Sequence, residues 1–176
     1  MGHRISAFLA ALILTLSLAV APVAADPIHN AAYLGDVANL KKLLASGVKV
    51  DARDYYGHTP LHRARTAEIA KVLLKAGAKV DARNESGWTP LYMAETAEVA
   101  KVLLKAGASV SSRAFLAYTP LHTAVNKADV VEFLLSVGAN GKARTEDGKT
   151  PFDLAKEAGT LQGKDAYWLL NDAQYD

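Results

Sequence analysis

The chain contains no cysteine. Without thiols it forms no disulfide, has no cysteine nucleophile and offers no thiolate to a metal ion. No cysteine is available to carry a lipid anchor at the N-terminus of a processed chain. The stability of the folded chain must therefore come from side-chain packing alone.

A large excess of one charge is missing as well. The chain has 20 Lys and Arg against 18 Asp and Glu, and no basic stripe stands out along the sequence. We therefore expect no nucleic-acid partner. The sequence also lacks a Gly-rich phosphate loop, a G-x-S-x-G turn and a set of paired carboxylates, so we expect neither a cofactor nor an enzyme.

Two histidines stand at a spacing that can hold a metal ion on a helix. His58 and His62 are four residues apart, but Thr59-Pro60 between them is typical of a helix start. The two rings would then not share one helical face. We expect no metal site here.

The first 25 residues differ from the rest and resemble a secretory signal peptide. Arg4 is followed by an apolar run without charge from Ile5 to Val20, and small residues stand at positions 23–25. The alternative is an uncleaved anchor, but the run is short of the roughly 20 residues that a spanning helix needs. We expect cleavage before Asp26, no membrane span afterwards, and a periplasmic or secreted protein. Without Arg4 the charges are 19 and 18, a net of +1.

Downstream of residue 25 the chain is built from repeats. TPLHRARTAEIAKVLLKAGAKVDARNESGW is followed directly by TPLYMAETAEVAKVLLKAGASVSSRAFLAY. A fixed period of this size indicates stacked units rather than one closed core. We predict one domain over residues 26–176, with repeats at about 26–58, 59–88, 89–118, 119–149 and 150–170.

Each unit reads as two helices and a turn. Thr59-Pro60 predicts the start of a short helix that runs to about Arg65, and Thr66 predicts the start of a second helix. Gly77 predicts its end, because glycine takes the left-handed conformation easily. An extended segment with a turn follows, which we call the finger. The sequence therefore predicts an all-α solenoid of helix-turn-helix units, with fingers that project from the stack.

The TPLH, LL-x-x-G-A and D/N-x-x-G segments resemble the ankyrin repeat, in register over residues 26 to about 170. The second and third copies are three residues short of the family's usual length. Three other departures stand out: Tyr92 replaces the motif histidine, Gly141 replaces the valine of the other copies, and the finger at residues 114–117 lacks its glycine. The resemblance implies that the motif histidines form hydrogen bonds within their turns.

The C-terminal segment is expected to close the stack. Thr150 to Leu170 contains apolar residues at helical spacing, and we expect Tyr167 and Trp168 to be packed rather than functional. The tail from Asn171 to Asp176 is expected to fray. Capped ends favour a monomer when the protein is free.

The resemblance places the partner-binding face along the fingers and on the concave helical floor. Aromatic side chains are favoured at the centres of protein interfaces. The short copies should leave a helical floor of Arg63, Arg65, Met93, Glu95, Thr123 and Val125. The residues that we predict to bind a partner are Tyr55, Tyr56, His58, Arg65, Trp88, Glu95, Phe115, Leu116, Tyr118 and Lys149.

These observations predict an exported module that binds a periplasmic protein through a concave aromatic finger face. By analogy with exported proteins of this family, we expect an inhibitor or immunity protein of an envelope enzyme. Two other functions stay open. One is binding of cell-wall glycan by the rings of Trp88 and Tyr118, and the other is stress protection together with a periplasmic redox enzyme.

Overall fold

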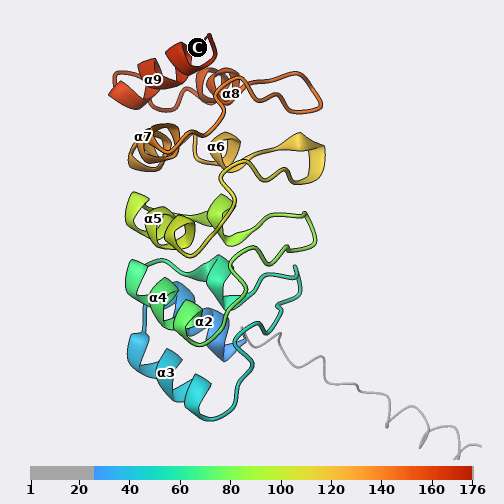
Figure 1. Ribbon diagram of the computed structural model, residues 1–176, viewed down its shortest axis with the longest axis vertical. Helices are drawn as coiled ribbons and strands as arrows, with labels where there is room; N and C mark the ends of the chain where they lie inside the picture. Colours follow the sequence, from blue (N-terminus) through green and yellow to red (C-terminus); the bar gives the residue numbers. More distant parts are fainter. Residues whose placement is uncertain (1–25, 176) are drawn as a thin grey trace, which may run out of the picture.

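The computed structural model describes residues 26–175, which form five stacked helical pairs with fingers projecting from one side (Figure 1). The predicted all-α stack is confirmed, and no strand occurs between residues 26 and 175. The predicted signal peptide lies outside the described residues. The elements are α2 (Pro27–Leu34), α3 (Val37–Ala45), η1 (Pro60–Arg63), α4 (Ala67–Lys75), η2 (Pro90–Met93), α5 (Ala97–Lys105), η3 (Phe115–Ala117), α6 (Pro120–Thr123), α7 (Ala128–Ser136), α8 (Pro151–Glu157) and α9 (Asp165–Ala173).

We call the second helix of each repeat its outer helix. In the two short repeats the outer helix begins and ends where the sequence predicts. The Thr66 hydroxyl accepts a hydrogen bond from the Ile69 N–H at 3.2 Å, which caps α4. Helix α4 ends at Lys75, and Gly77 follows with a φ of 91°. Thr96 caps α5 in the same way. These local signals explain why the second helices of both short repeats have the same length.

The first helix of each short repeat is shorter than predicted. We expected it to reach about Arg65, but η1 is a 3-10 turn that ends at Arg63. Ala64 then takes an extended conformation, with φ −65° and ψ 103°. The short repeat has too few residues for another helical turn before the cap at Thr66. By contrast, α2 in the full-length first repeat has 8 residues.

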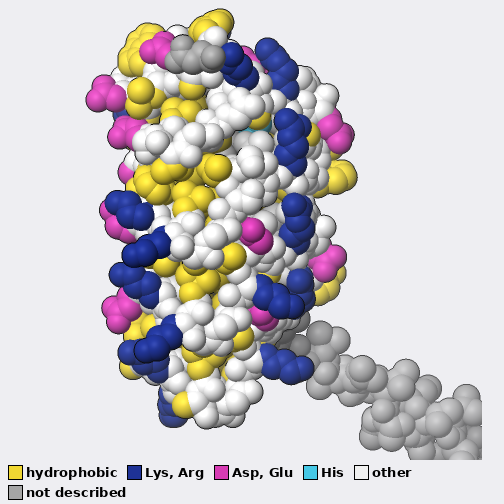
Figure 2. All heavy atoms as spheres, in the orientation of Figure 1, with side chains coloured by type: hydrophobic (Ala, Val, Ile, Leu, Met, Phe, Trp, Pro, Cys, Tyr) yellow, Lys and Arg dark blue, Asp and Glu magenta, His cyan; other side chains and the backbone are white. Residues whose placement is uncertain are grey.

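The core runs through the whole stack rather than gathering at one centre. The leucine of each Thr-Pro-Leu turn is buried, and so is a leucine from each outer helix behind it: Leu61, Leu91, Leu121, Leu73, Leu103 and Leu134. Figure 2 shows one face of the molecule. On its helical side, hydrophobic side chains lie between rows of Lys and Arg. No helix among residues 26–175 combines the length and the apolar character that a membrane crossing requires.

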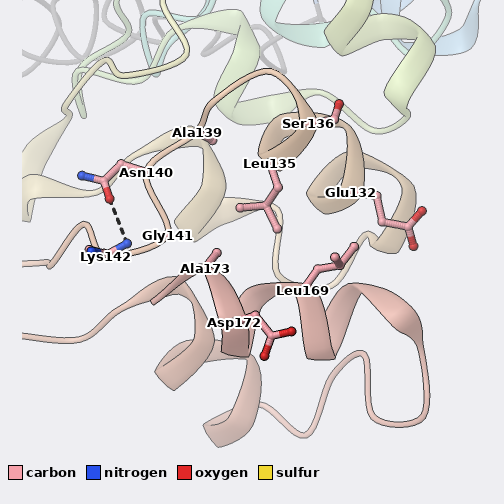
Figure 3. Close-up of a pocket in the computed structure, with 10 residues that line it drawn as sticks. All are labelled: Glu132, Leu135, Ser136, Ala139, Asn140, Gly141, Lys142, Leu169, Asp172 and Ala173. Atoms are coloured by element: carbon pink, nitrogen blue, oxygen red, sulfur yellow. Dashed lines mark hydrogen bonds between the residues drawn. The ribbon is translucent and has the colours of Figure 1, made fainter. Parts of the chain in front are cut away.

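Helix α9 closes the stack by lying directly on Gly141 (Figure 3). A Cβ added to Gly141 would stand 2.5 Å from the Ala173 Cβ. The departure from valine at this position is therefore what lets α9 pack closely. Because α9 extends to Ala173, our expectation that the tail frays from Asn171 is wrong for its first residues.

The two aromatic residues of α9 have different environments. Tyr167 packs against Phe152, with ring centroids 5.0 Å apart. Trp168 is 60% exposed, so our expectation that it is packed is wrong. Residues 167 and 168 are neighbours on a helix and point about 100° apart. Only one of the two rings can face α8.

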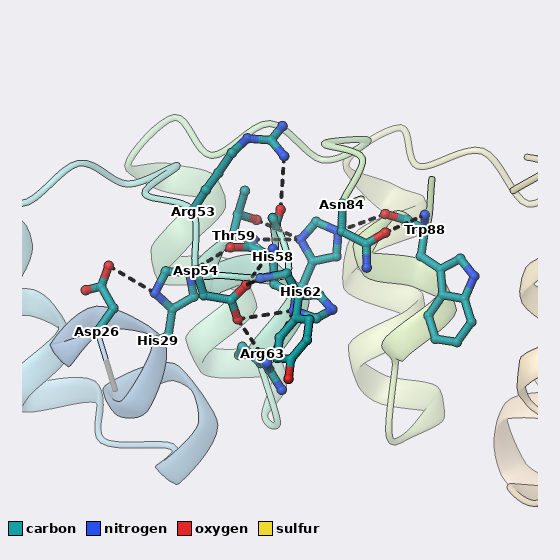
Figure 4. Close-up of polar contacts among 12 residues, drawn as sticks. Asp26, His29, Arg53, Asp54, His58, Thr59, His62, Arg63, Asn84 and Trp88 are labelled. Atoms are coloured by element: carbon teal, nitrogen blue, oxygen red, sulfur yellow. Dashed lines mark hydrogen bonds and ion pairs between the residues drawn. The ribbon is translucent and has the colours of Figure 1, made fainter. Parts of the chain in front are cut away.

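A ladder of hydrogen bonds joins each repeat to the next, and Figure 4 shows its first two contacts. His29 Nε2 lies 2.8 Å from the His58 carbonyl oxygen, and His62 Nε2 lies 2.9 Å from that of Trp88. The Thr59 N–H donates to His62 Nδ1 at 3.0 Å, so Nε2 carries the ring proton and donates. The expected bond within the turn is present. The same ring also joins two repeats.

Tyr92 continues this ladder in place of a histidine. Its hydroxyl lies 2.6 Å from the carbonyl oxygen of Ser112 and 3.0 Å from that of Tyr118. The phenol ring has no nitrogen near the start of its turn, however. As a result the buried Thr89 hydroxyl has no hydrogen-bond partner among the described residues, whereas the Thr59 hydroxyl lies 2.9 Å from His62 Nδ1.

We predict that Gly141→Val destabilises the protein by about 1–3 kcal/mol, because the larger side chain must push α9 away from the stack. Urea unfolding followed by circular dichroism measures this change. An unfolding midpoint equal to that of the unchanged protein would show that α9 does not depend on this contact.

We predict opposite effects for one substitution made in two repeats. Thr59→Val removes a buried hydrogen bond and should lower the free energy of unfolding by about 1 kcal/mol. Thr89→Val removes an unpaired buried hydroxyl and should leave that free energy unchanged or raise it. Chemical denaturation of the two variants provides the comparison, and an equal loss in both would contradict the assignment.

We predict that the protein loses stability as the pH falls from about 6.5 to about 4. Burial lowers the pKa of His62 to about 4 and also lowers the pKa of His122. Between these pH values the unfolded chain binds more protons than the folded chain, so acid favours unfolding, and the stabilisation is complete above about pH 6.5.

Tyr92 stands in the third repeat at the position that His62 has in the second, so His62→Tyr is the variant that tests this assignment. His62→Tyr should reduce the loss of unfolding free energy between pH 6.5 and pH 4, whatever its effect at pH 7. Urea titrations at several pH values measure it. An unchanged pH dependence in this variant would show that His62 is not responsible.

Candidate functional site

The fingers are closed by the same two backbone hydrogen bonds. In the first finger the Asp54 N–H donates to the His58 carbonyl at 3.0 Å, and the Gly57 N–H donates to the Asp54 carbonyl at 2.9 Å. The fingers that start at Asn84, Ala114 and Thr145 repeat both bonds. Each finger is therefore a defined turn rather than a loose loop.

The finger tips are also bonded to one another. The Glu85 N–H donates to the Tyr56 carbonyl at 3.1 Å, and the Phe115 N–H donates to the Ser86 carbonyl at 3.2 Å. The Glu146 N–H donates to the Leu116 carbonyl at 3.0 Å. These bonds run across all four tips, so the side chains there are presented on a connected backbone.

The third finger lacks the local devices that stabilise its neighbours. Asp54 Oδ1 accepts from the N–H groups of Tyr56 and His58, each at 2.9 Å, but Ala114 has no acceptor at the same position. Leu116 and Ala117 have φ values of 57° and 60°, in the left-handed region that glycine favours. Local strain of this kind is retained mainly at functional sites.

The predicted tip residues are the most exposed aromatic residues of the fingers. Tyr55 is 84% exposed, Phe115 70% and Tyr56 61%. Leu116 is exposed as well, at 38%. The rings of Tyr55 and Tyr56 meet edge to face, with centroids 5.2 Å apart. These four side chains can be covered by a partner without first breaking a contact to the core.

The aromatic residues before the Thr-Pro turns are more enclosed. Trp88 is half-buried, and its ring stacks on that of Tyr92 with centroids 6.1 Å apart and an angle of 11° between the planes. Tyr118 is also half-buried and packs beside His122. Both can contribute an edge to an interface, but part of each ring already belongs to the stack.

His58 is held by charged neighbours within the first finger (Figure 4). Its Nδ1 lies 3.1 Å from Asp54 Oδ2, to which Arg63 also donates at 2.9 Å. Burial by itself would raise the pKa of Asp54, but the Arg63 side chain and the His58 backbone N–H lower it to about 2. Burial lowers the pKa of His58. His58 therefore stabilises the first finger, and its ring is already engaged with Asp54 in the absence of a partner.

The predicted polar residues of the site are already paired. The Arg65 guanidinium lies 5.0 Å from the centre of the Tyr33 ring. Glu95 forms an ion pair with Lys127 at 3.2 Å, and Lys149 forms one with Glu157 at 2.6 Å. Arg65 and Glu95 line a hollow on the helical floor, whereas Lys149 lies beside Asp147 and Gly148 of the fourth finger.

The short repeats leave a hollow on the helical floor. It has a volume of about 220 Å³ and is lined by Tyr33, His62, Arg63, Ala64, Arg65, Met93 and Glu95. Sequence analysis identified Arg63, Arg65, Met93 and Glu95 on this floor, but it also placed there Thr123 and Val125, which do not line the hollow. It missed Tyr33 on the floor and Lys127 as the partner of Glu95. Tyr33 comes from the full-length first repeat, and Lys127 reaches back to Glu95 from the fourth. Only the difference in length between the short repeats and their full-length neighbours could have indicated Tyr33 and Lys127.

Among residues 26–175 there is no group of three or more His, Asp or Glu side chains placed to hold a metal ion. The side chains of Asp54 and Asn84 accept the hydrogen bonds that close their turns. The fingers offer a partly apolar surface on a connected backbone.

Comparison with known proteins agrees with this architecture. A family model described as ankyrin repeats in three copies matches residues 28–114. A second, described as ankyrin repeats in many copies, matches residues 103–155. No curated protein matches the chain. Ankyrin repeats are typically non-catalytic modules that bind other proteins, and this chain belongs to the ankyrin repeat family.

Proposed function

We propose that the chain is an exported protein-binding module and that its finger tips contact a periplasmic partner. The observation that carries the proposal is the exposure of Tyr55, Tyr56 and Phe115 on fingers bonded to one another. A rigid aromatic surface loses little conformational entropy on binding. The face can therefore bind tightly without a deep pocket.

The proposed role is inhibition or immunity toward an envelope enzyme. Fingers that project from a stack can enter or cover the cleft of another protein. Phe115 and Leu116 stand at the tip of the strained third finger, where the sequence keeps apolar side chains in place of glycine and a polar residue. A strained, exposed apolar tip has no evident structural benefit, which supports a binding role.

Two other roles remain alternatives. Sugar stacking on Trp88 and Tyr118 has less support, because both rings are half-buried against the stack while other finger aromatics are open. Partnership with a redox enzyme would use the same finger face, so only the identity of the bound protein separates it from inhibition.

We predict that Tyr55→Ala/Phe115→Ala weakens partner binding by roughly tenfold or more, since aromatic residues at the centre of an interface each contribute over 1 kcal/mol. The measurement is retention of an envelope protein on the immobilised chain, followed by its dissociation constant. An activity assay of a retained enzyme, with and without the chain, tests inhibition.

Trp168→Ala is the matched control, because Trp168 is an exposed aromatic residue of α9 outside the fingers. It should leave binding unchanged. Equal loss in the control and the finger variant would refute the finger site. Retention on purified peptidoglycan in place of a protein would favour glycan binding.

A further inference from the structure

Stacking aligns four arginines that are far apart in the sequence. Arg53, Arg83, Arg113 and Arg144 each stand directly before a finger, and all four side chains are exposed. Arg53 Nη1 donates to the Arg83 carbonyl at 2.8 Å, and Arg83 Nη1 donates to the Arg113 carbonyl at 2.9 Å. Figure 2 shows Lys and Arg side chains in a column along the finger side of the molecule. Sequence analysis found no basic stripe because a repeat separates neighbouring members.

Backbone contacts hold three of these four guanidinium groups in place. Arg53, Arg83 and Arg144 each donate from Nη1 to the carbonyl of their own finger's glycine. None of the four arginines has a carboxylate oxygen within 4.0 Å among residues 26–175. The remaining N–H groups of Arg53, Arg83 and Arg144 are thus oriented but not neutralised by an ion pair, which favours binding of an external anion.

Arg113 differs from the other three. Its finger has no glycine, and its side chain makes no hydrogen bond with residues 26–175. The structural task that the other arginines perform is absent at this position. The exposed Arg113 guanidinium is therefore available to a ligand outside the chain.

The charge beside the column changes along the stack. The residue two places before each arginine is Asp51, Asp81, Ser111 and Lys142 in turn. The first two repeats therefore carry a carboxylate two places before the arginine and the later two do not, while Glu146 and Asp147 follow Arg144 in the fourth finger and Asp172 lines the same hollow as Lys142. Asp153 lies near Arg144, but its carboxylate accepts two hydrogen bonds from Thr150. We call Arg113, Lys142 and Arg144 the basic ridge.

We propose that the basic ridge binds an acidic segment of the protein partner, with Asp and Glu carboxylates as its ligands. The proposal rests on the function proposed above and names the chemistry of the partner. Arg113 of the ridge adjoins the third finger, since it is two residues from Phe115. One partner can therefore place an apolar group on the finger tip and carboxylates on the ridge. Arginine clusters recognise acidic segments in this way.

A defined polyanion tests the ridge without knowledge of the partner. Binding of a fluorescent poly-L-glutamate peptide to the purified protein is measured by anisotropy at low ionic strength. Arg113→Gln/Lys142→Gln removes two charges whose side chains form no hydrogen bond with the described residues. We expect the dissociation constant to rise about three- to tenfold, and added salt should abolish the difference.

The control is Lys71→Gln/Lys105→Gln, which removes the same charge from exposed positions on α4 and α5. It should leave binding unchanged. Equal loss in both variants would overturn the proposal in favour of net charge alone. Tighter binding of polyphosphate or oligothymidylate of equal charge would overturn it in favour of a phosphate ligand, and no binding of the peptide would also overturn it.

Phe115→Ala separates this proposal from the finger site. It should leave poly-L-glutamate binding unchanged while it weakens binding of the envelope partner. If the partner depends on Phe115 but the peptide does not respond to the ridge variant, the finger site stands and the ridge proposal fails. If the peptide responds to the ridge variant and the partner does not depend on the tips, the finger site fails.

Discussion

The structure depends on one repeated contact, the hydrogen bond from the fourth residue of each TPLH turn to the carbonyl before the next Thr-Pro. His29, His62 and His122 make it with Nε2, and Tyr92 makes it with its hydroxyl. The ring N–H or hydroxyl that donates this bond is buried and would be costly to leave without a partner, so each repeat needs its neighbour. The contact fixes the spacing of the turns, and the fingers take their spacing from it.

Rigid fingers follow from this constraint. The tips are joined by backbone hydrogen bonds, and Arg53 and Arg83 each donate to a carbonyl of the next repeat. A finger can therefore tolerate unfavourable residues if its neighbours hold it. The third finger is the example, because Leu116 and Ala117 keep a left-handed backbone between two fingers that bond to it on either side.

The two short repeats divide the surface into separate parts. Because η1 and η2 end early, a hollow forms on the helical floor between α2 and the fourth repeat. Tyr33, Arg65 and Glu95 line this hollow. The apolar tips and the basic ridge lie on the finger side instead. A partner that binds the fingers need not enter the hollow. The residues that the sequence assigned to one binding face therefore fall into two groups, one on the fingers and one around the hollow.

The sequence by itself determined the repeats, the helix starts at Thr66 and Thr96, and the left-handed glycines, because these depend on short-range hydrogen bonding and backbone sterics. It also identified the exposed finger aromatics. Only the tertiary structure decided that Gly141 receives α9, that Trp168 is open and that the arginines form a column. These features arise between residues about thirty positions apart, where no local pattern records which surfaces meet.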